Sequence, residues 1–362
     1  MNVNSQNLSS IRKNKTFNNP ERFIEGWYWV LPSQNLRVGD VKAVTILGRE
    51  LAIYRGKDKR VVTCDAYCPH MGAHLGEGNV KGNELRCFFH HWQFDAEGIC
   101  VDIPCLDEPL PIKIRTWPTA EKYGLIWIWT GDIPKHPIPS APELEYKELD
   151  FAFGPRIVMN SHPHVVMINA IDIQHFNTVH KLASDIVFEK QELHQNAITF
   201  VNTKYDGREA LFLNVIRPFY KNAITYSVCY WYGSTGIVTI GTDFLHVHIM
   251  FTLRLLEAGK SEAQSLIMIK KRQGIFGWLY NLFVLWLAKT FVKHFIQGDT
   301  KVFQTMQFNL KTPIKADQSI MQFINHLERQ KPLNWGTWNL ARSQNVEIRE
   351  SREKWRDALS ND

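Results

Sequence analysis

Between residues 26 and 131, short runs of apolar and β-branched residues alternate with turn signals. Runs of this length and composition predict β-strands, and Arg55-Gly56-Lys57-Asp58 is one of the turn signals that separate them. The pattern predicts a small antiparallel β-domain. The strands that we expect cover 41–47, 50–54, 60–63, 84–87 and 124–129.

A proline-rich segment follows. The sequence DIPKHPIPSAP at 132–142 holds four prolines in eleven residues, which removes backbone donors and favours an extended chain. We therefore place a domain boundary there. Beyond it the apolar pattern first has a helical period, then the period of strands, then a helical period again, which predicts an α+β domain with one antiparallel sheet flanked by helices. The strands expected are 197–205, 210–217, 224–231, 237–245, 247–255 and 265–270, and the helices are 165–182, 278–295, 300–308 and 318–329.

The length of 362 residues supports this division, because one hydrophobic core rarely organises more than about 250–300 residues. The prediction is a polar tail at 1–25, a first domain at 26–131, a linker at 132–142, a second domain at 143–335 and a helical tail at 336–362. The net charge of +6 is mild and no long basic run occurs, so nucleic-acid binding has little support. The opening stretch lacks the apolar core of a secretory signal, and we expect a cytoplasmic protein.

Four residues form the first group of candidate metal ligands. Cys68 and His70 make a C-x-H motif, and Cys87 and His90 make a C-x-x-H motif after sixteen intervening residues. Two thiolates and two imidazoles suit a tetrahedral zinc ion. Zinc fingers, however, pair Cys with Cys and His with His, whereas here each motif supplies one of each. This order is typical of a [2Fe–2S] cluster in which two cysteines hold one iron and two histidines hold the other.

The segments CPHMGAHLGEG and CFFHHWQFD resemble the two cluster loops of a Rieske domain. Respiratory Rieske proteins add a bridging disulfide, but Ala73 and Phe89 stand where its cysteines would fall. The resemblance is therefore to the oxygenase and ferredoxin branch. In that branch Gly usually stands at the position of His91, which puts the local backbone angle in question. His74 and His91 are interpreted as loop polar groups, and the other cysteines as small buried residues: Cys64, Cys100, Cys105 and Cys229.

The second group lies at 169–180 and contains the pattern N-x-x-D-x-x-H-x₄-H. His175 and His180 are five residues apart, so on an ideal helix they would point about 140° apart. A shared metal therefore requires a π-bulge or a helix end between them. Asp172 is three residues before His175, where its carboxylate could orient a histidine ring. A solvated polar helix face is the alternative.

The block 169–180 resembles the iron-binding segment of Rieske non-haem iron oxygenases, which follows the Rieske domain in the same order. Two histidines leave a ferrous ion one carboxylate short of a facial triad with open positions. The segment QGDTKVF resembles the family's acidic-ligand region, and it implies Asp299 as the third ligand. The alternative is that Asp299 caps a helix starting at Thr300. Rival carboxylates are Asp243 and Glu262. The remaining histidine pair, His246 and His248, is interpreted as part of a polar sheet face.

The resemblance implies an oxygenase that receives electrons through a [2Fe–2S] cluster and activates O₂ at Fe(II) to oxidise a lipophilic ring compound. The sequence offers no nucleotide fingerprint, so the partner is a ferredoxin or a flavin reductase that uses NADH or NADPH. The family also implies a homotrimer in which Asp172 bridges the cluster of one subunit and the iron of the next. The steroid and natural-product branch fits best. The alternative from another class is an electron-transfer or redox-sensing protein whose second domain binds no iron.

The most apolar segment runs from 275 to 288 and is followed by Lys289. It is shorter than the roughly 20 residues that a membrane span needs. It is interpreted either as a core helix or as a surface at 275–295 that contacts a membrane.

Overall fold

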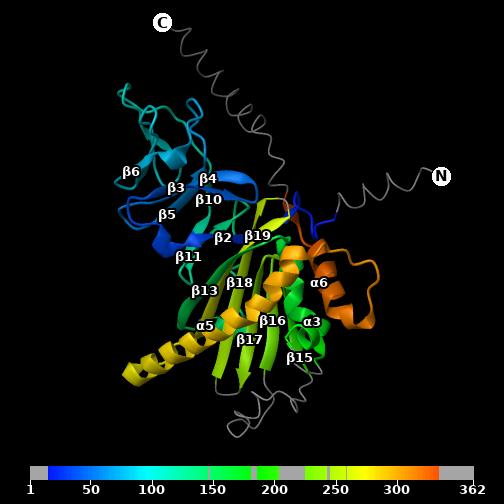
Figure 1. Cartoon of the computed structure of the whole chain (residues 1–362). Coiled ribbons are helices and arrows are strands. Elements are labelled where there is room, and N and C mark those ends of the chain that lie inside the picture. Colours follow the sequence, from blue (N-terminus) through cyan, green and yellow to red (C-terminus); the bar gives the residue numbers. More distant parts are fainter. Residues whose placement is uncertain are drawn as a thin grey trace, which may run out of the picture.

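The computed structural model describes residues 15–145, 147–180, 186–203, 225–242, 245–257 and 259–333. Figure 1 shows an all-β part, in blue and cyan, beside a larger part in which helices cover a sheet. This is the α+β arrangement predicted from the pattern of the sequence. The helical segment predicted at 336–362 and the strand predicted at 210–217 lie outside the described residues.

Three small antiparallel sheets build the first part. Their orders are β10-β5-β4-β3, β11-β12-β2 and β6-β7-β8-β9. Each strand predicted in this region is present, with ends that differ by one or two residues. The strands are β2 Trp27–Pro32, β3 Val41–Ile46, β4 Arg49–Arg55, β5 Val61–Asp65, β6 Asn79–Lys81, β7 Glu84–Arg86, β8 Gln93–Phe94, β9 Cys100–Asp102, β10 Thr116–Trp117, β11 Thr119–Lys122 and β12 Leu125–Trp129.

Strand β12 joins the cores of the two parts. Its sequence LIWIW is buried throughout, and alternate residues of a strand point to opposite faces. Ile126 and Ile128 enter the core of the first part, whereas Trp127 and Trp129 enter the core of the second. The neighbouring β2 alternates in the same way. A continuous apolar run is therefore what a strand between two cores requires.

Within the described residues, one antiparallel sheet of seven strands forms the second part, in the order β13-β19-β18-β17-β16-β15-β14. The chain adds the five strands β14 to β18 one after another, and β19 then lies between β18 and β13. The two edge strands, β13 and β14, were not predicted, because Gly154-Pro155 interrupts the apolar pattern of β13 and β14 is a charged run at 188–194. The strands are β13 Leu149–Met159, β14 Phe188–His194, β15 Ala197–Asn202, β16 Thr225–Trp231, β17 Thr235–Thr242, β18 Leu245–Glu257 and β19 Lys260–Lys270.

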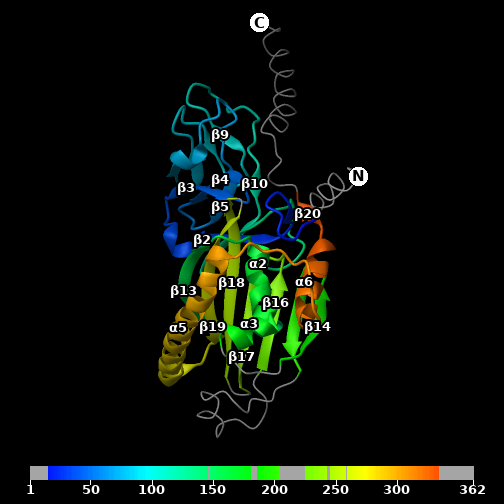
Figure 2. The ribbon, with the colours of Figure 1, turned by 45° about the vertical axis from the view of Figure 1, so that its right-hand side comes forward.

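Helices lie on one face of this sheet (Figures 1 and 2), with α5 across β13 and β19 and α6 beside β14 and β15. Two helix predictions were wrong. The helix expected at 165–182 is broken into α2 Pro163–Met167, the 3₁₀ segment η4 Ile168–Ile171 and α3 Ile173–Thr178. The helices expected at 278–295 and 300–308 are one helix, α5 Gly274–Thr305, because no residue between them breaks it. Helix α6 covers Gln318–Glu328.

The last eleven residues of the predicted N-terminal tail pack against the second part of the chain. Glu328 accepts hydrogen bonds from the backbone of Thr16 and Phe17 at 2.9 and 3.0 Å. Strand β1, Phe23–Ile24, pairs with β20, Pro332–Leu333. The prediction of a tail reaching to residue 25 is therefore wrong for 15–25. The composition of this segment is polar, and the few apolar residues in it become buried only when the chain folds.

Candidate metal centres

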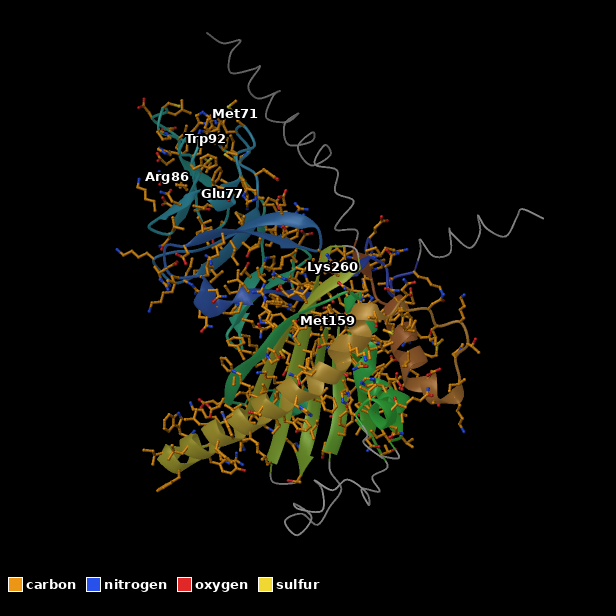
Figure 3. All side chains as sticks on the ribbon, in the orientation of Figure 1. Met71, Glu77, Arg86, Trp92, Met159 and Lys260 are labelled. Atoms are coloured by element: carbon orange, nitrogen blue, oxygen red, sulfur yellow. The ribbon has the colours of Figure 1, made fainter. Side chains whose placement is uncertain are left out.

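The first group of predicted ligands lies on two turns with the same hydrogen bonds. The Cys68 carbonyl accepts from the Gly72 amide at 2.9 Å, and the Cys87 carbonyl accepts from the His91 amide at 3.1 Å. The two cysteine amides in turn donate to Ala73 and Trp92, each at 2.9 Å. The two motifs therefore fold alike, and each presents one thiol and one imidazole. Met71 and Trp92 mark the position of these turns in Figure 3, in the part of the first domain farthest from α3 and α5.

The backbone angle questioned at His91 takes a definite value. Residues 72 and 91 hold equivalent places in the two turns, and their φ angles are 77° and 61°. Both lie in the left-handed region, which glycine adopts without a steric penalty and other residues do not. His91 therefore adopts the glycine conformation rather than changing the turn.

The four side chains form two pairs. The Cys68 and Cys87 thiols are buried and close enough to hydrogen-bond. The exposed His70 and His90 rings are 4.6 Å apart, and Trp92 stacks on His70. Burial, partly offset by a backbone hydrogen bond at His70, acts with the Cys87 thiol to raise the pKa of Cys68 to about 12. The two buried groups would therefore become thiolates only if a bound cation stabilised their charge.

This arrangement fits a two-iron cluster better than zinc. A zinc ion would draw four ligand atoms around one point. Across the described parts of the chain, only one group of three or more Cys, His, Asp or Glu side chains has all its ligand atoms within 4.8 Å, and these four residues are not in it. A thiol pair and an imidazole pair side by side match the two irons of a Rieske cluster.

Other residues near the cluster motifs have ordinary roles. His74 caps the short η2 helix, Leu75–Glu77, by accepting from the Gly76 amide at 3.0 Å. The thiols of Cys64, Cys100 and Cys229 are buried, as predicted, but Cys105 is exposed, so that prediction was wrong for it. Cys105 lies in a turn after β9, where no strand covers it.

The group that does meet the 4.8 Å criterion consists of His175, His180 and Asp299. The Nε2 atoms of the two histidines are 2.9 Å apart, and each is 2.9 Å from Oδ1 of Asp299. The side chains of His175 and His180 are only 6% and 7% exposed, and that of Asp299 is 15% exposed. The structure therefore brings the three predicted residues to one point, although Asp299 is more than a hundred residues away in sequence.

A helix end allows the two histidines to meet, as the spacing required. Helix α3 ends at Thr178, so His175 lies within the helix and His180 in the bend that follows it. Asp299 does not begin a helix, because α5 continues through it. The capping alternative at Thr300 is therefore wrong.

The break before α3 is stabilised by hydroxyl groups from other elements. A broken helix leaves carbonyl groups without partners inside the helix. Tyr230 and Tyr226 of β16 donate to the carbonyls of Met167 and Ala170 at 2.7 and 2.9 Å, and Ser319 of α6 donates to Ile171 at 2.8 Å. Sequence reasoning missed these positioning residues, because nothing in a tyrosine or serine side chain indicates which carbonyl it will reach.

Helix α5 presents a second residue to the site besides Asp299. Phe295 lies one helical turn earlier, and its ring stacks on His180 with centroids 3.5 Å apart and planes 10° apart. Gly298 lets the helix approach closely, because a Cβ atom there would lie 3.3 Å from Val179. The spacing of four between Phe295 and Asp299 is the one sequence signal that would have associated them.

Asp172 lies at the N-terminus of α3. Its Oδ1 accepts from the backbone amide of His175 at 3.1 Å, which makes it the N-cap of the helix. Helix caps of this kind stabilise the first turn, so Asp172 fixes the backbone that carries His175.

The rival groups have other partners. Glu262 is buried and forms ion pairs with Arg156 and Arg254, whereas Asp243 lies outside the described residues. His246 contacts Glu143 at 2.6 Å, and His248 contacts Thr239 at 2.9 Å. This pair thus forms part of a hydrogen-bonded face of the sheet, and His248 on it is buried.

The electrostatics of the three-residue site suit a cation. Burial alone would raise the pKa of Asp299, but hydrogen bonds and charge from His175 and His180 outweigh burial, and the net pKa is lowered. The carboxylate is therefore ionised at neutral pH, as a metal ligand must be. Two imidazoles and one carboxylate form the donor set of a non-haem Fe(II) facial triad.

Comparison with known proteins supports the first of the two centres directly. Residues 26–118 match the Rieske [2Fe-2S] domain family. Cholesterol 7-desaturase nvd of Bombyx mori is 38% identical over 185 residues, which cover 49% of this chain and 40% of that protein. The chain is a homologue of Rieske oxygenase alpha subunits. The "Probable 3-ketosteroid-9-alpha-monooxygenase, oxygenase component" of Rhodococcus rhodochrous is 32% identical over 168 residues, 44% of this chain and 42% of that protein.

The fold of this Rieske oxygenase homologue extends beyond the region of sequence similarity. The structure of NdmB from Pseudomonas putida CBB5 superposes with a TM-score of 0.65 at 18% identity, over 83% of this chain and 89% of that one. The sequence matches cover less than half the length of the two curated relatives. The antiparallel Rieske domain and the sheet-and-helix domain predicted from sequence are therefore confirmed as the Rieske oxygenase fold.

Proposed function

We propose that this chain is the terminal component of a Rieske-type non-haem iron oxygenase. It would receive electrons through a [2Fe–2S] cluster at Cys68, His70, Cys87 and His90 and use O₂ to oxidise a lipophilic, ring-containing substrate. The observation that carries the proposal is the convergence of His175, His180 and Asp299 within 2.9 Å in a chain that also has a Rieske domain.

The three protein ligands would hold a mononuclear iron, which supplies oxygen activation when it is bound with open coordination positions. The chain itself contributes a largely buried site, in which both histidine side chains are less than a tenth exposed. The Asp172 cap and the tyrosine hydroxyls hold the histidine backbone in place. Phe295 covers one face of His180 and keeps water away from that ring.

For the substrate we propose a sterol or steroid. The names of the two curated relatives refer to cholesterol and to a ketosteroid. A sterol is a lipophilic ring compound of the kind expected from the sequence. Hydroxylation and desaturation need the same two metal centres and differ in where the substrate carbon lies.

Electron transfer is proposed to cross between subunits. The cluster turns, marked by Met71 and Trp92, lie in the part of the first domain farthest from α3 and α5 (Figures 1 and 3), and these two helices carry His175 and Asp299. A homotrimer would bring the cluster of one subunit to the site of its neighbour, with Asp172 between them. A separate ferredoxin or flavin reductase using NADH or NADPH would supply the electrons.

Iron content tests the proposal against the alternative, an electron carrier with no second iron site. The wild-type protein should hold two cluster irons and one mononuclear iron per chain. Asp299→Ala should lose the mononuclear iron and all substrate-coupled O₂ uptake, yet keep the visible spectrum of the cluster. Glu262→Gln is the matched control, because it removes a buried carboxylate outside the site. Two irons per chain in the wild-type protein, after reconstitution with ferrous iron, would favour the carrier.

A further inference from the structure

The N-terminal half of α5 carries large apolar side chains that the rest of the described chain leaves exposed. The helix is long and apolar enough to be a candidate membrane span, yet only 22% of its most apolar 18-residue window is buried. A core helix would be mostly buried, so the core interpretation of this segment does not hold. We call these residues the α5 apolar face: Ile275, Phe276, Trp278, Leu279, Tyr280, Leu282, Phe283, Trp286, Leu287 and Phe291.

The strongly polar side chain within this segment points away from solvent. Asn281 is 1% exposed, and its amide donates to Asp150 at 2.7 Å and to the Lys270 carbonyl at 3.1 Å. Its hydrogen bonds therefore stay inside the protein. Apart from the Tyr280 hydroxyl and the indole N–H groups of Trp278 and Trp286, the α5 apolar face offers water no hydrogen-bonding side chain. Such a contiguous patch typically marks an interaction surface.

The charges carried by the apolar segment of α5 have one sign, and the acidic groups beside it, Asp150 and Glu148, are bonded to Asn281 and Lys271. No Asp or Glu occurs between Glu262 and Asp299, whereas Lys270, Lys289 and Lys293 are present and exposed. Trp278, Trp286 and Tyr280 are of the residue types that collect at membrane interfaces. Lysines beside an apolar aromatic surface complement the anionic head groups of a lipid bilayer.

A crevice of about 210 Å³ lies between the helix and β13 at the edge of the α5 apolar face. Apolar side chains from both elements line it, together with Asp150 and Asn281. The apolar residues that line it are Leu149, Phe151, Trp278, Leu282 and Leu285.

We propose that the α5 apolar face docks this protein onto an anionic lipid bilayer, with the helix lying in the head-group region. The helix does not cross the bilayer, although its length and composition alone would allow it. The apolar stretch before Lys289, 275–288, is about 21 Å long at 1.5 Å per residue, short of the roughly 30 Å of hydrocarbon. Its inward side packs on β13 and β19 through Val284, Leu285 and Val292, so it cannot leave the sheet.

The same helix connects the docked surface to the three-residue site. Asp299 lies eight residues beyond Phe291, about 12 Å along the helix axis. A lipophilic compound dissolved in the bilayer would therefore meet the protein close to the catalytic end of α5. The docking itself does not depend on the proposed activity and can be tested without it.

Flotation of the purified full-length protein tests the proposal. The protein should float with vesicles of phosphatidylcholine and phosphatidylglycerol and bind less to phosphatidylcholine alone. Phe276→Asp and Phe283→Asp should each weaken binding about tenfold or more, since each removes a buried aromatic side chain from lipid. Lys289→Gln and Lys293→Gln should each weaken binding to anionic vesicles about fivefold. Ile133→Asp is the control, because the exposure of Ile133, 76%, lies between those of Phe283 and Phe276, but Ile133 lies in the linker.

A second copy of this chain is the competing occupant. Light scattering on the same variants separates the two, because lipid docking predicts an unchanged oligomeric mass for Phe276→Asp. The proposal is overturned if the wild-type protein does not float, if Ile133→Asp weakens binding as much as Phe276→Asp, or if Phe276→Asp breaks an oligomer and leaves flotation intact. Equal binding to neutral vesicles would overturn the requirement for anionic lipid. Circular dichroism shows that each variant is folded.

Discussion

His91 holds a backbone conformation that its side chain disfavours. Its φ of 61° matches the φ of 77° at Gly72 in the paired turn. The left-handed conformation costs a non-glycine residue about 1–2 kcal/mol, and glycine loses about 0.5–1 kcal/mol through its freer unfolded state. We therefore predict that His91→Gly raises the free energy of unfolding by about 0.5–1 kcal/mol, measured by denaturant titration of the holoprotein.

His91→Ala is the control for this prediction. It removes the imidazole but keeps the Cβ atom that causes the strain, so it should give no gain. An equal gain from alanine and glycine would show that the imidazole, and not the backbone angle, is unfavourable.

Asp172 combines a structural contact that the structure shows with a proposed role in electron transfer, and two substitutions separate them. Asparagine caps helices as well as aspartate does, so Asp172→Asn should keep the stability of the protein and its iron content. It removes the negative charge, and coupled turnover should fall about tenfold or more. Asp172→Ala should in addition lower the free energy of unfolding by about 1 kcal/mol. Full turnover by Asp172→Asn, in an assay with a reductase, would show that Asp172 acts only as the helix cap and has no role in electron transfer.

At the scale of elements, α5 contributes a metal-ligand candidate and the ring that orients a second one. Phe295 stacks on His180 at 3.5 Å. We predict that Phe295→Leu, which keeps an apolar group but loses the flat ring, weakens mononuclear iron binding about tenfold. Competition with a ferrous chelator measures this loss, while the visible spectrum reports the intact cluster.

Phe276→Leu is the matched substitution near the other end of α5, because Phe291 stacks on Phe295 itself at 5.6 Å. Phe276 is 84% exposed. It should keep the iron affinity of the wild-type protein. A similar loss in both variants would mean that α5 responds as a whole and that stacking at His180 has no separate effect.

At the scale of the molecule, buried histidines make stability depend on pH. Burial lowers the pKa of His162, His248 and His326 to about 4. In the unfolded chain these groups bind protons below pH ~6.5, so between these values the unfolded state holds more protons. The free energy of unfolding should therefore fall as the pH drops from about 6.5 to 4, by up to about 1.4 kcal/mol per pH unit for each histidine.

Denaturant titrations at several pH values measure this slope. His162 caps α2 by accepting from the His164 amide, and His162→Asn keeps a capping acceptor without a titrating group. The variant should show a smaller slope than the wild-type protein. An identical slope would mean that His162 is protonated to the same extent in the folded and unfolded states.

The sequence by itself determined the local chemistry. Ligand order at residues 68–90 predicted the cluster turns, and the spacing of His175 and His180 predicted a helix end between them, because both depend on residues near each other in the chain. Strand patterning predicted five strands of the first domain to within one or two residues at each end, but it missed the short strands β6, β8, β9, β10 and β11, and β2.

Tertiary structure alone decided how distant parts meet. It placed Asp299 on an unbroken α5 beside His180, supplied Tyr226, Tyr230 and Ser319 to the carbonyls of a broken helix, and packed residues 15–25 against Glu328. Local propensity carries no information on these contacts, because each depends on two surfaces that approach only after folding. Only the tertiary structure shows that the α5 apolar face is exposed, because the same apolar sequence could lie in a core or on a surface.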